Sequence, residues 1–60
     1  MSFGAALALL MVGVSIRRAN WSAHVARHPD VIRLVWRSGI ATPWHPTPDD
    51  LLANDWLVAE

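Results

Sequence analysis

The chain contains no cysteine and no lysine, and it has no apolar run long enough to cross a bilayer. The absence of cysteine excludes disulfides, thiolate zinc sites and thiol chemistry. The apolar segment that begins at Phe3 holds about a dozen residues, whereas a membrane span needs roughly 20. A secretory signal carries its positive charge before the apolar stretch, but Arg17 and Arg18 follow it here. We therefore expect a cytosolic protein with no membrane partner.

The charged residues are few and balanced. Five basic residues stand against five acidic ones, so the formal net charge is zero. No basic stripe is available for a nucleic-acid polymer, and we expect no such partner. All the cations are arginines, which suit planar, bidentate recognition of a phosphate or carboxylate. The base composition of the source genome is an equally good explanation of an arginine-only chain.

The length of 60 residues predicts one small domain over residues 1–60. A chain of this size buries only about 60% of its unfolded surface, so its core alone leaves it marginally stable. The composition is 53% hydrophobic and 17% charged, which is too apolar for a disordered tail. With disulfides and thiolate metal sites excluded, oligomerisation is the remaining common way to stabilise it. We expect a homo-oligomer in which apolar surface faces another copy.

The first segment predicts a helix over residues 3–12. Ser2 is a favourable N-cap, and Gly13 stands where a helix commonly ends in a left-handed conformation. The predicted helix has no polar face, so it has to be covered on all sides. We expect one side to pack on the chain's own sheet and the other on a neighbouring subunit.

The middle of the chain alternates apolar and polar residues, which is typical of strands. Residues 22–27 and 31–37 flank a His-Pro-Asp turn and predict a hairpin. Period two places Ile32, Leu34 and Trp36 on one face of the second of these strands. In all, strands are predicted at residues 14–18, 22–27, 31–37, 40–44 and 56–59, with Ser38-Gly39 as a second tight turn and Pro43 confining the fourth strand to an edge or an end.

A second, short helix is predicted over residues 48–53. Thr47 is its N-cap, Pro48 occupies the first helical position, and Asp50 is placed to complete a capping box. Asn54 is expected to end the helix in a left-handed conformation. The predicted order of a helix, three or four antiparallel strands, a short helix and a last strand indicates an α+β domain.

Residues that carry a family resemblance run in order from residue 3 to residue 58. Together they resemble the second type of Thoeris anti-defence protein, a phage-encoded family. They are the opening Phe3-Gly4-x-Ala6-Leu7, Gly13, the step Arg18-x-x-Trp21, and the closing Pro43-Trp44-x-Pro46-Thr47-x-x-Asp50-Leu51-Leu52-Ala53-x-Asp55-Trp56.

This resemblance implies a sponge rather than an enzyme. Proteins of that family bind cyclic nucleotide immune signals, notably glycocyclic ADP-ribose and in some members cyclic dinucleotides, and hold them without cleaving them. The resemblance also implies a homotetramer with ligand pockets at subunit contacts, no cofactor, and a location in the cytoplasm of the infected bacterial host.

The four tryptophans are numerous for so small a core. An exposed indole offers a flat face on which a nucleobase stacks for roughly 1–3 kcal/mol. Trp36 and Trp56 lie in predicted strands with apolar partners, and we expect both in the core. Trp21 and Trp44 lie at strand ends beside polar or proline residues, so we assign them as ligand-binding residues, with core packing as the alternative.

Three polar residues complete the predicted ligand site. Arg18 precedes Trp21 by three residues, so a turn brings charge for a phosphate next to a plane for a base; its alternative role is an ion pair with Asp50 or Asp55. Thr47 and Asp50 first of all cap the second helix, but the amides of that helix start and the Thr47 hydroxyl offer contacts to a phosphate or ribose, and the Asp50 carboxylate accepts from a hydroxyl or amino group. The other arginines are expected on a solvated sheet face, namely Arg17, Arg27, Arg33 and Arg37.

The three histidines do not predict a catalytic or metal site. His24 and His28 are four residues apart, a spacing that aligns ligands on a helix, yet they lie in a predicted strand and its turn. No trustworthy serine, histidine and aspartate order is present either. We therefore favour a binding protein over its two alternatives, a small phosphodiesterase that uses the histidines and a structural or interaction module without a small ligand.

Overall fold

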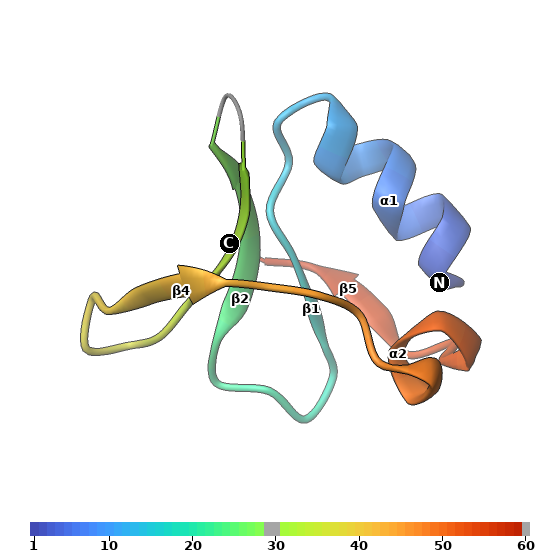
Figure 1. The fold of residues 1–60 in the computed structure, drawn as a ribbon. Coiled ribbons are helices and arrows are strands. Elements are labelled where there is room, and N and C mark those ends of the chain that lie inside the picture. Colours follow the sequence, from blue (N-terminus) through green and yellow to red (C-terminus); the bar gives the residue numbers. More distant parts are fainter. Residues whose placement is uncertain (29–30, 60) are drawn as a thin grey trace.

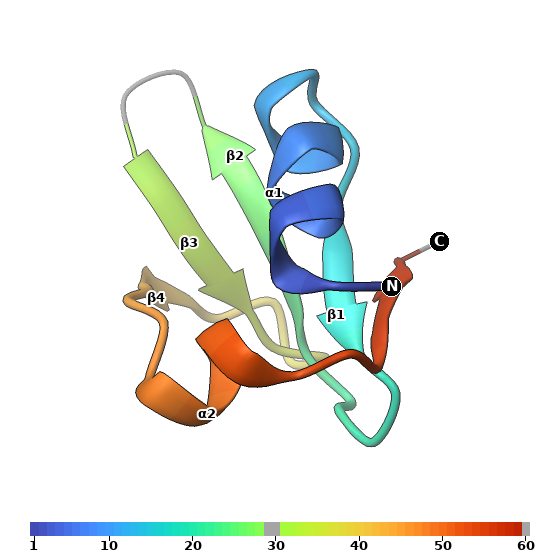
Figure 2. The ribbon, with the colours of Figure 1, turned by 90° about the vertical axis from the view of Figure 1, so that its right-hand side faces the viewer.

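The computed structural model describes residues 1–28 and 31–59. Five antiparallel strands form one sheet in the order β4-β3-β2-β1-β5, and two helices lie on the same face of it (Figures 1 and 2). This arrangement confirms the predicted α+β class. The elements are α1 (Phe3–Met11), β1 (Ile16–Arg18), β2 (His24–His28), β3 (Val31–Val35), β4 (Ala41–Pro43), α2 (Pro48–Leu52) and β5 (Trp56–Val58).

Local sequence signals mark both ends of helix α1. The Ser2 Oγ accepts a hydrogen bond from the amide of Ala5 at 3.3 Å. The helix ends one residue earlier than predicted, and Gly13 follows with a φ of +93°. In that conformation the amide of Val14 donates to the carbonyl of Leu9 at 3.0 Å, which satisfies a carbonyl at the helix end.

The predicted antiparallel pairing of β2 and β3 is confirmed, although β2 begins two residues later and β3 ends two residues earlier than predicted. Five residue pairs are in register, from His24 opposite Val35 to His28 opposite Val31. The Pro29-Asp30 part of the predicted turn lies outside the described residues. Strand β1 is two residues shorter than predicted and pairs with both β2 and β5, so it lies between these two strands.

The last third of the chain contains one correction. Strand β4 pairs only with β3, as expected of an edge strand that ends at Pro43. Helix α2 begins with the predicted capping box of Thr47 and Asp50. The prediction that Asn54 ends this helix in a left-handed conformation is wrong: in the described ranges no residue other than glycine has a positive φ, and Ala53 is extended instead. The chain runs from this extended residue almost directly into β5.

The core lies between the sheet and α1. Its fully buried members come from α1, β1, β2 and β5, and Trp56 has the largest side chain among them, as predicted for a core tryptophan. Phe3, Trp21 and Trp44 surround Trp56 with ring centroids 5.4–6.1 Å from its own. The buried hydrophobic cluster consists of Ala6, Leu10, Ile16, Val25 and Trp56.

The opposite face of the sheet carries different residues. Because paired residues of neighbouring strands share a face, the register places Arg17 beside His24, and His24 opposite Val35, away from the helices. Within residues 1–28 and 31–59, no helix covers this open face (Figure 2). Side chains on it are therefore available to a ligand or a partner.

Candidate functional site

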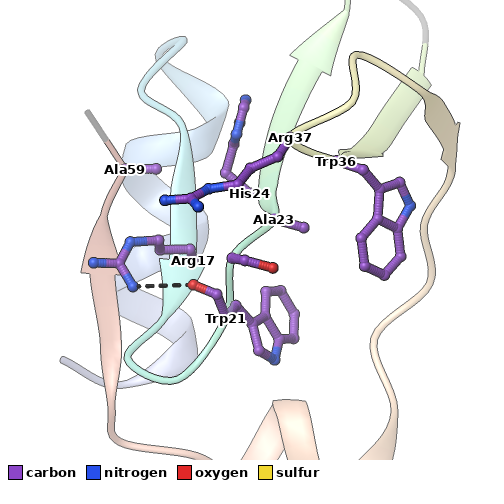
Figure 3. A pocket seen from close by; sticks show the side chains of 8 residues that line it. Arg17, Trp21, Ala23, His24, Trp36, Arg37 and Ala59 are labelled. Carbon is purple, nitrogen blue, oxygen red and sulfur yellow. Dashed lines mark hydrogen bonds between the residues drawn. The ribbon is translucent and has the colours of Figure 1, made fainter.

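A pocket of about 450 Å³ opens where β1, the start of β2 and the turn after β3 meet (Figure 3). Its volume is within the range of about 300–1,000 Å³ that is usual for small-molecule sites. We call it the tryptophan-arginine pocket. It is lined by Arg17, Trp21, Ser22, Ala23, His24, Trp36, Arg37 and Ala59.

Arg17 reaches this pocket from β1 and also holds the loop that follows the strand. One guanidinium nitrogen, Nη1, donates to the carbonyls of Arg18, Ala19 and Trp21 at 3.1, 3.2 and 3.4 Å. Figure 3 shows the contact to Trp21 as a dashed line. The same side chain therefore brings positive charge to the pocket and fixes the backbone from which the Trp21 indole projects.

The Trp21 indole is held from its other side by aromatic neighbours. It makes edge-on contacts with Trp56, at 5.4 Å between ring centroids and 79° between planes, and with Trp44, at 6.4 Å and 75°. Such geometry is the favoured one for aromatic pairs. Trp21 is thus partly buried and pre-positioned at the edge of the core, while it still lines the pocket.

The prediction that Trp36 belongs to the core is wrong. Strand β3 ends at Val35, so Trp36 lies beyond the strand and does not pack against the buried core cluster. Trp36 instead opens a turn: its amide donates to the carbonyl of Ile40, its carbonyl accepts from the amide of Gly39, and Gly39 has a φ of +90°. The Trp36 side chain is 45% exposed.

Arg37 is the next residue of that turn and is exposed. Figure 3 shows its guanidinium extending toward β1 and Arg17, while the indoles of Trp21 and Trp36 lie at the other side of the pocket. His24 completes the polar lining, and no carboxylate lines the pocket among the described residues. The arrangement offers hydrogen-bond donors and positive charge on one side and aromatic planes on the other, which suits an anion that carries a flat ring.

The predicted site residue Arg18 lies on the opposite, helix-covered side of β1. Its Nε donates to Asp55 Oδ1 at 2.8 Å and its Nη1 donates to Asp50 Oδ1 at 3.1 Å. The alternative prediction for Arg18, an ion pair with Asp50 or Asp55, is therefore confirmed, and Arg18 pairs with both. The hydrogen bond from Arg18 lowers the pKa of Asp55, outweighing the opposing effect of desolvation, and the same contact raises the pKa of Arg18.

Thr47 and Asp50 belong to the same structural cluster. The Thr47 Oγ1 accepts from the amide of Asp50 at 3.3 Å, and Asp50 Oδ2 accepts from the amide of Thr47 at 2.9 Å. Asp50 is only 6% exposed, and its carbonyl accepts a hydrogen bond from the indole Nε1 of Trp56. The predicted helix start is thus occupied by a carboxylate, which disfavours a second anion there. We call Arg18, Thr47, Asp50 and Asp55 the carboxylate clasp.

Trp44 belongs to the group of aromatic side chains around Trp56. It contacts Trp21 and Trp56, and it lines an apolar groove beside Phe3 and Leu7 of α1. Of the five residues predicted to bind a ligand, the structure therefore places Trp21 in the tryptophan-arginine pocket and Trp44 next to Trp21. Arg18, Thr47 and Asp50 lie in the carboxylate clasp, and their contact with a ligand stays a prediction.

Of the eight lining residues only Trp21 was predicted as a site residue; the polar and aromatic ones that were not predicted are Arg17, His24, Trp36 and Arg37. One sequence signal was available for two of them, because Trp36 and Arg37 stand directly before the Ser38-Gly39 turn. An aromatic and an arginine in a turn lie at the surface more often than in a core. Arg17 and His24 carry no such local signal, since only the pairing of β1 with β2 brings them together.

Among the described residues, no group of three metal-ligating side chains lies close enough to hold a metal ion. None of the helices in the described ranges has the length and apolar character that a bilayer crossing requires.

A comparison with protein families gives a match over nearly the whole chain. The model of the Thoeris anti-defense 2-like domain matches residues 1–59. No curated protein matches the chain. The match covers both helices, all five strands and every residue of the tryptophan-arginine pocket. The chain therefore belongs to the Thoeris anti-defense 2-like family, and this membership implies a role in countering Thoeris defence.

Proposed function

We propose that this protein counters Thoeris defence as a sponge: it binds a cyclic nucleotide immune signal of the glycocyclic ADP-ribose type and holds it without cleaving it. The observation that supports this most directly is the tryptophan-arginine pocket, which pairs Arg17 and Arg37 with two indoles. Guanidinium groups form strong, charge-assisted hydrogen bonds with phosphates, and indoles stack on bases. A signal of this type contains both phosphates and a base.

Sequestration needs affinity rather than turnover. To hold a scarce signal against its receptor, the sponge has to bind at about nanomolar concentration, which corresponds to roughly −12 kcal/mol. A pocket open on one protomer gains affinity when another surface closes over it and removes water from the charged contacts. We therefore expect the functional pocket to be completed by a second copy.

We expect no cleavage, and the positions of the acids support this expectation. General acid-base catalysis requires a group of suitable pKa within hydrogen-bond reach of the reacting atom. Asp50 and Asp55 are engaged by Arg18 on the helix-covered side, away from the pocket. His24 is the one histidine among the residues that line the pocket. A single histidine without a paired acid or base is a weak basis for phosphodiester hydrolysis.

Assembly is part of this proposal, and the apolar surface of the helices supports it. Val12, just after α1, is 76% exposed, and Leu52 of α2 is 81% exposed. Met11 and Leu51 are about half exposed on the same two helices, and a helix with no polar face needs cover on both sides. We propose that other copies of the chain cover this surface, in a homotetramer that acts in the cytoplasm of the infected host.

Light scattering tests the assembly. We expect wild-type protein to be oligomeric at micromolar concentration and the double variant Val12→Glu, Leu52→Glu to dissociate, because each charge would be buried in a subunit contact. Asp49→Asn changes the charge of α2 at an exposed polar position and should leave the assembly intact. A monomeric wild type would contradict the proposal.

One capture experiment tests the function. Protein is mixed with glycocyclic ADP-ribose or a cyclic dinucleotide, the free ligand is measured after filtration, and the complex is then heated. We expect the ligand to disappear from the filtrate and to return chemically intact by mass spectrometry. A linear or hydrolysed product would support the phosphodiesterase alternative, and an unchanged filtrate would support a structural module.

A further inference from the structure

The formal net charge of zero conceals an uneven distribution of charge between the two sides of the sheet. Arg18 and the acids that it pairs with lie on the helix-covered side, and α2 carries one more acid on that side (Figure 2). The acids among the described residues are Asp49, Asp50 and Asp55. Asp30 and Glu60 lie outside the described residues. Within the described ranges, the open face of the sheet therefore carries no negative charge.

Three arginines lie on the other side of the sheet or at its edge. Arg33 follows Ile32 and precedes Leu34 in β3, and both of these neighbours pack against the core, so alternation directs Arg33 to the open face. Arg17 lies on the open face of β1, and Arg37 extends toward it from the turn after β3 (Figure 3). None of the three forms an ion pair within the described ranges. We call Arg17, Arg33 and Arg37 the cationic face.

Arg33 is outside the lining of the tryptophan-arginine pocket but close to it. The register of β2 and β3 pairs Arg33 with Ala26, two positions along β2 from His24, which lines the pocket. Two positions along a strand correspond to about 7 Å. The Debye length is about 8 Å at 0.15 M ionic strength and about 30 Å at 0.01 M. The charge of Arg33 therefore acts on an anion that approaches the pocket, and more strongly at low salt.

We propose that the cationic face steers the anionic signal into the tryptophan-arginine pocket, and that Arg33 raises the rate of association without contacting the bound signal. The proposal rests on the sponge function proposed above and adds the way in which the signal is reached. Clefts lined by charge of one sign focus the electric field and raise association rates. A sponge competes with the receptor for each newly made molecule, so its association rate matters as well as its affinity.

The surroundings of Arg33 favour action at a distance over a contact. The strand pairs between Arg33 and the pocket place Ala26 and Val35 on the same face, and neither side chain offers a hydrogen bond to an anion. A nucleic-acid polymer would need a longer row of cations than these three. A small anion needs only a gradient of potential that ends at the pocket. The segregation of the described acids to the helix-covered side keeps that gradient from being cancelled.

Stopped-flow fluorescence tests the steering, because the indoles of the pocket report the binding of glycocyclic ADP-ribose. We expect the wild-type association rate constant to fall several-fold between about 10 and about 150 mM ionic strength. Arg33→Glu should slow association about 5- to 10-fold at the lower ionic strength and about twofold at the higher one, by Coulomb's law for two ligand charges at about 10 Å. The dissociation rate constant should stay unchanged, because Arg33 does not touch the bound signal.

Three further variants separate the position of a charge from its chemistry and from the net charge. Arg33→Lys keeps the charge and should keep the association rate, because long-range attraction does not need the guanidinium fork. Arg33→Gln removes one charge and should slow association about two- to threefold at low ionic strength. Asn54→Asp lowers the net charge equally at an exposed position after α2 and should change the rate little. Equal slowing by Arg33→Gln and Asn54→Asp would overturn the steering by the cationic face.

Two other results would overturn the steering as well. One is a wild-type association rate that does not depend on ionic strength, a measurement that needs no variant. The other is an effect of Arg33→Glu confined to the dissociation rate, which would indicate a direct contact.

The outcomes also distinguish the failure of this inference from that of the proposed function. If the signal is captured and Arg33→Glu associates like wild type, the sponge stands and the steering is wrong. If no cyclic signal is captured, the sponge is wrong, and the same ionic-strength series with adenosine 5′-diphosphate tests the cationic face. Association of that nucleotide that depends on Arg33 and on salt would support the steering, and its absence would overturn both proposals.

Discussion

The two faces of the sheet use the same kinds of side chain for opposite purposes. On the helix-covered face, Arg18 meets Asp50 and Asp55, and Trp56 is fully buried with its indole nitrogen bonded to the carbonyl of Asp50. By contrast, Arg37 and Trp36 lie at the surface in the turn after β3, beside a hollow that Arg17 and His24 of the open face also line. Charge and aromatic area stabilise the fold on one side and remain available to a ligand on the other.

This difference teaches that residue type alone does not locate a site in so small a domain. Arg17 and Arg18 are neighbours in sequence, yet they lie on opposite faces of β1. The Arg18 charge is balanced by two carboxylates, whereas Arg17 bonds only to neutral carbonyls among its described contacts. Only the second arrangement leaves net positive charge for an anion.

The largest expected effect is the difference in stability between a variant that lacks the buried Trp56 and one that lacks the exposed Trp36. Trp56→Ala removes the largest side chain of the core and should cost about 3–5 kcal/mol, comparable with the whole stability of a domain of this size. Trp36→Ala should change the free energy of unfolding by about 0.5 kcal/mol or less, as surface substitutions do. Urea unfolding monitored by circular dichroism measures both, and equal losses would contradict the contrast between the faces.

The carboxylate clasp should give the next largest effect. Asp50→Ala leaves Arg18 and the amide of Thr47 without their buried acceptor, which should cost about 1–3 kcal/mol. Asp49→Ala changes the adjacent acid, which is exposed, and should cost clearly less. Thermal unfolding of the two variants provides the comparison. A milder effect at Asp50 than at Asp49 would show that the clasp contributes little.

Much of the fold was predictable from local signals. Ser2 and Gly13 mark the ends of α1, and the Thr47 and Asp50 capping box marks the start of α2, because each of these residues satisfies backbone groups within a few positions. One miss is local, since Asn54 does not adopt a left-handed conformation, and the other concerns where a strand ends. Trp36 leaves the core because β3 stops at Val35, where the turn toward β4 begins.

The site was less predictable for the same reason. Trp21, which was predicted as a ligand-binding residue because it stands at a strand end in the sequence, lines the pocket. The other members of the pocket come from β1, from β2 and from the turn after β3, and only the strand order places them together. Arg18 is close to Trp21 in the sequence, which is why it was predicted as a site residue. The register of β1 instead directs Arg17 to the pocket and Arg18 to the helix-covered face.

An arginine pair on the open face tests which charges belong to the pocket. Arg37→Ala should weaken capture of the cyclic signal about tenfold or more, because a hydrogen bond to a charged group contributes about 1.5–3 kcal/mol. Arg33→Ala removes the same charge from β3 outside the pocket lining and should have little effect. Equilibrium dialysis at two salt concentrations measures both variants. Equal losses would indicate diffuse attraction rather than a phosphate contact.

The smallest expected effect is a pH dependence of the folding stability, which arises from Asp55 on the helix-covered face. The fold holds the pKa of Asp55 below that of the unfolded chain, chiefly through the hydrogen bond from Arg18. The ionised carboxylate therefore stabilises the folded state above the unfolded value of about 3.9, and this contribution is lost as the pH falls through the lower folded pKa. The stability difference between wild type and Asp55→Asn, measured by urea unfolding, should be constant from pH 7 to 5 and should shrink below pH 4. In an Arg18→Gln background the same substitution should show a much weaker pH dependence. A difference that stays constant down to pH 2 would mean that Arg18 and Asp55 do not stabilise each other in solution.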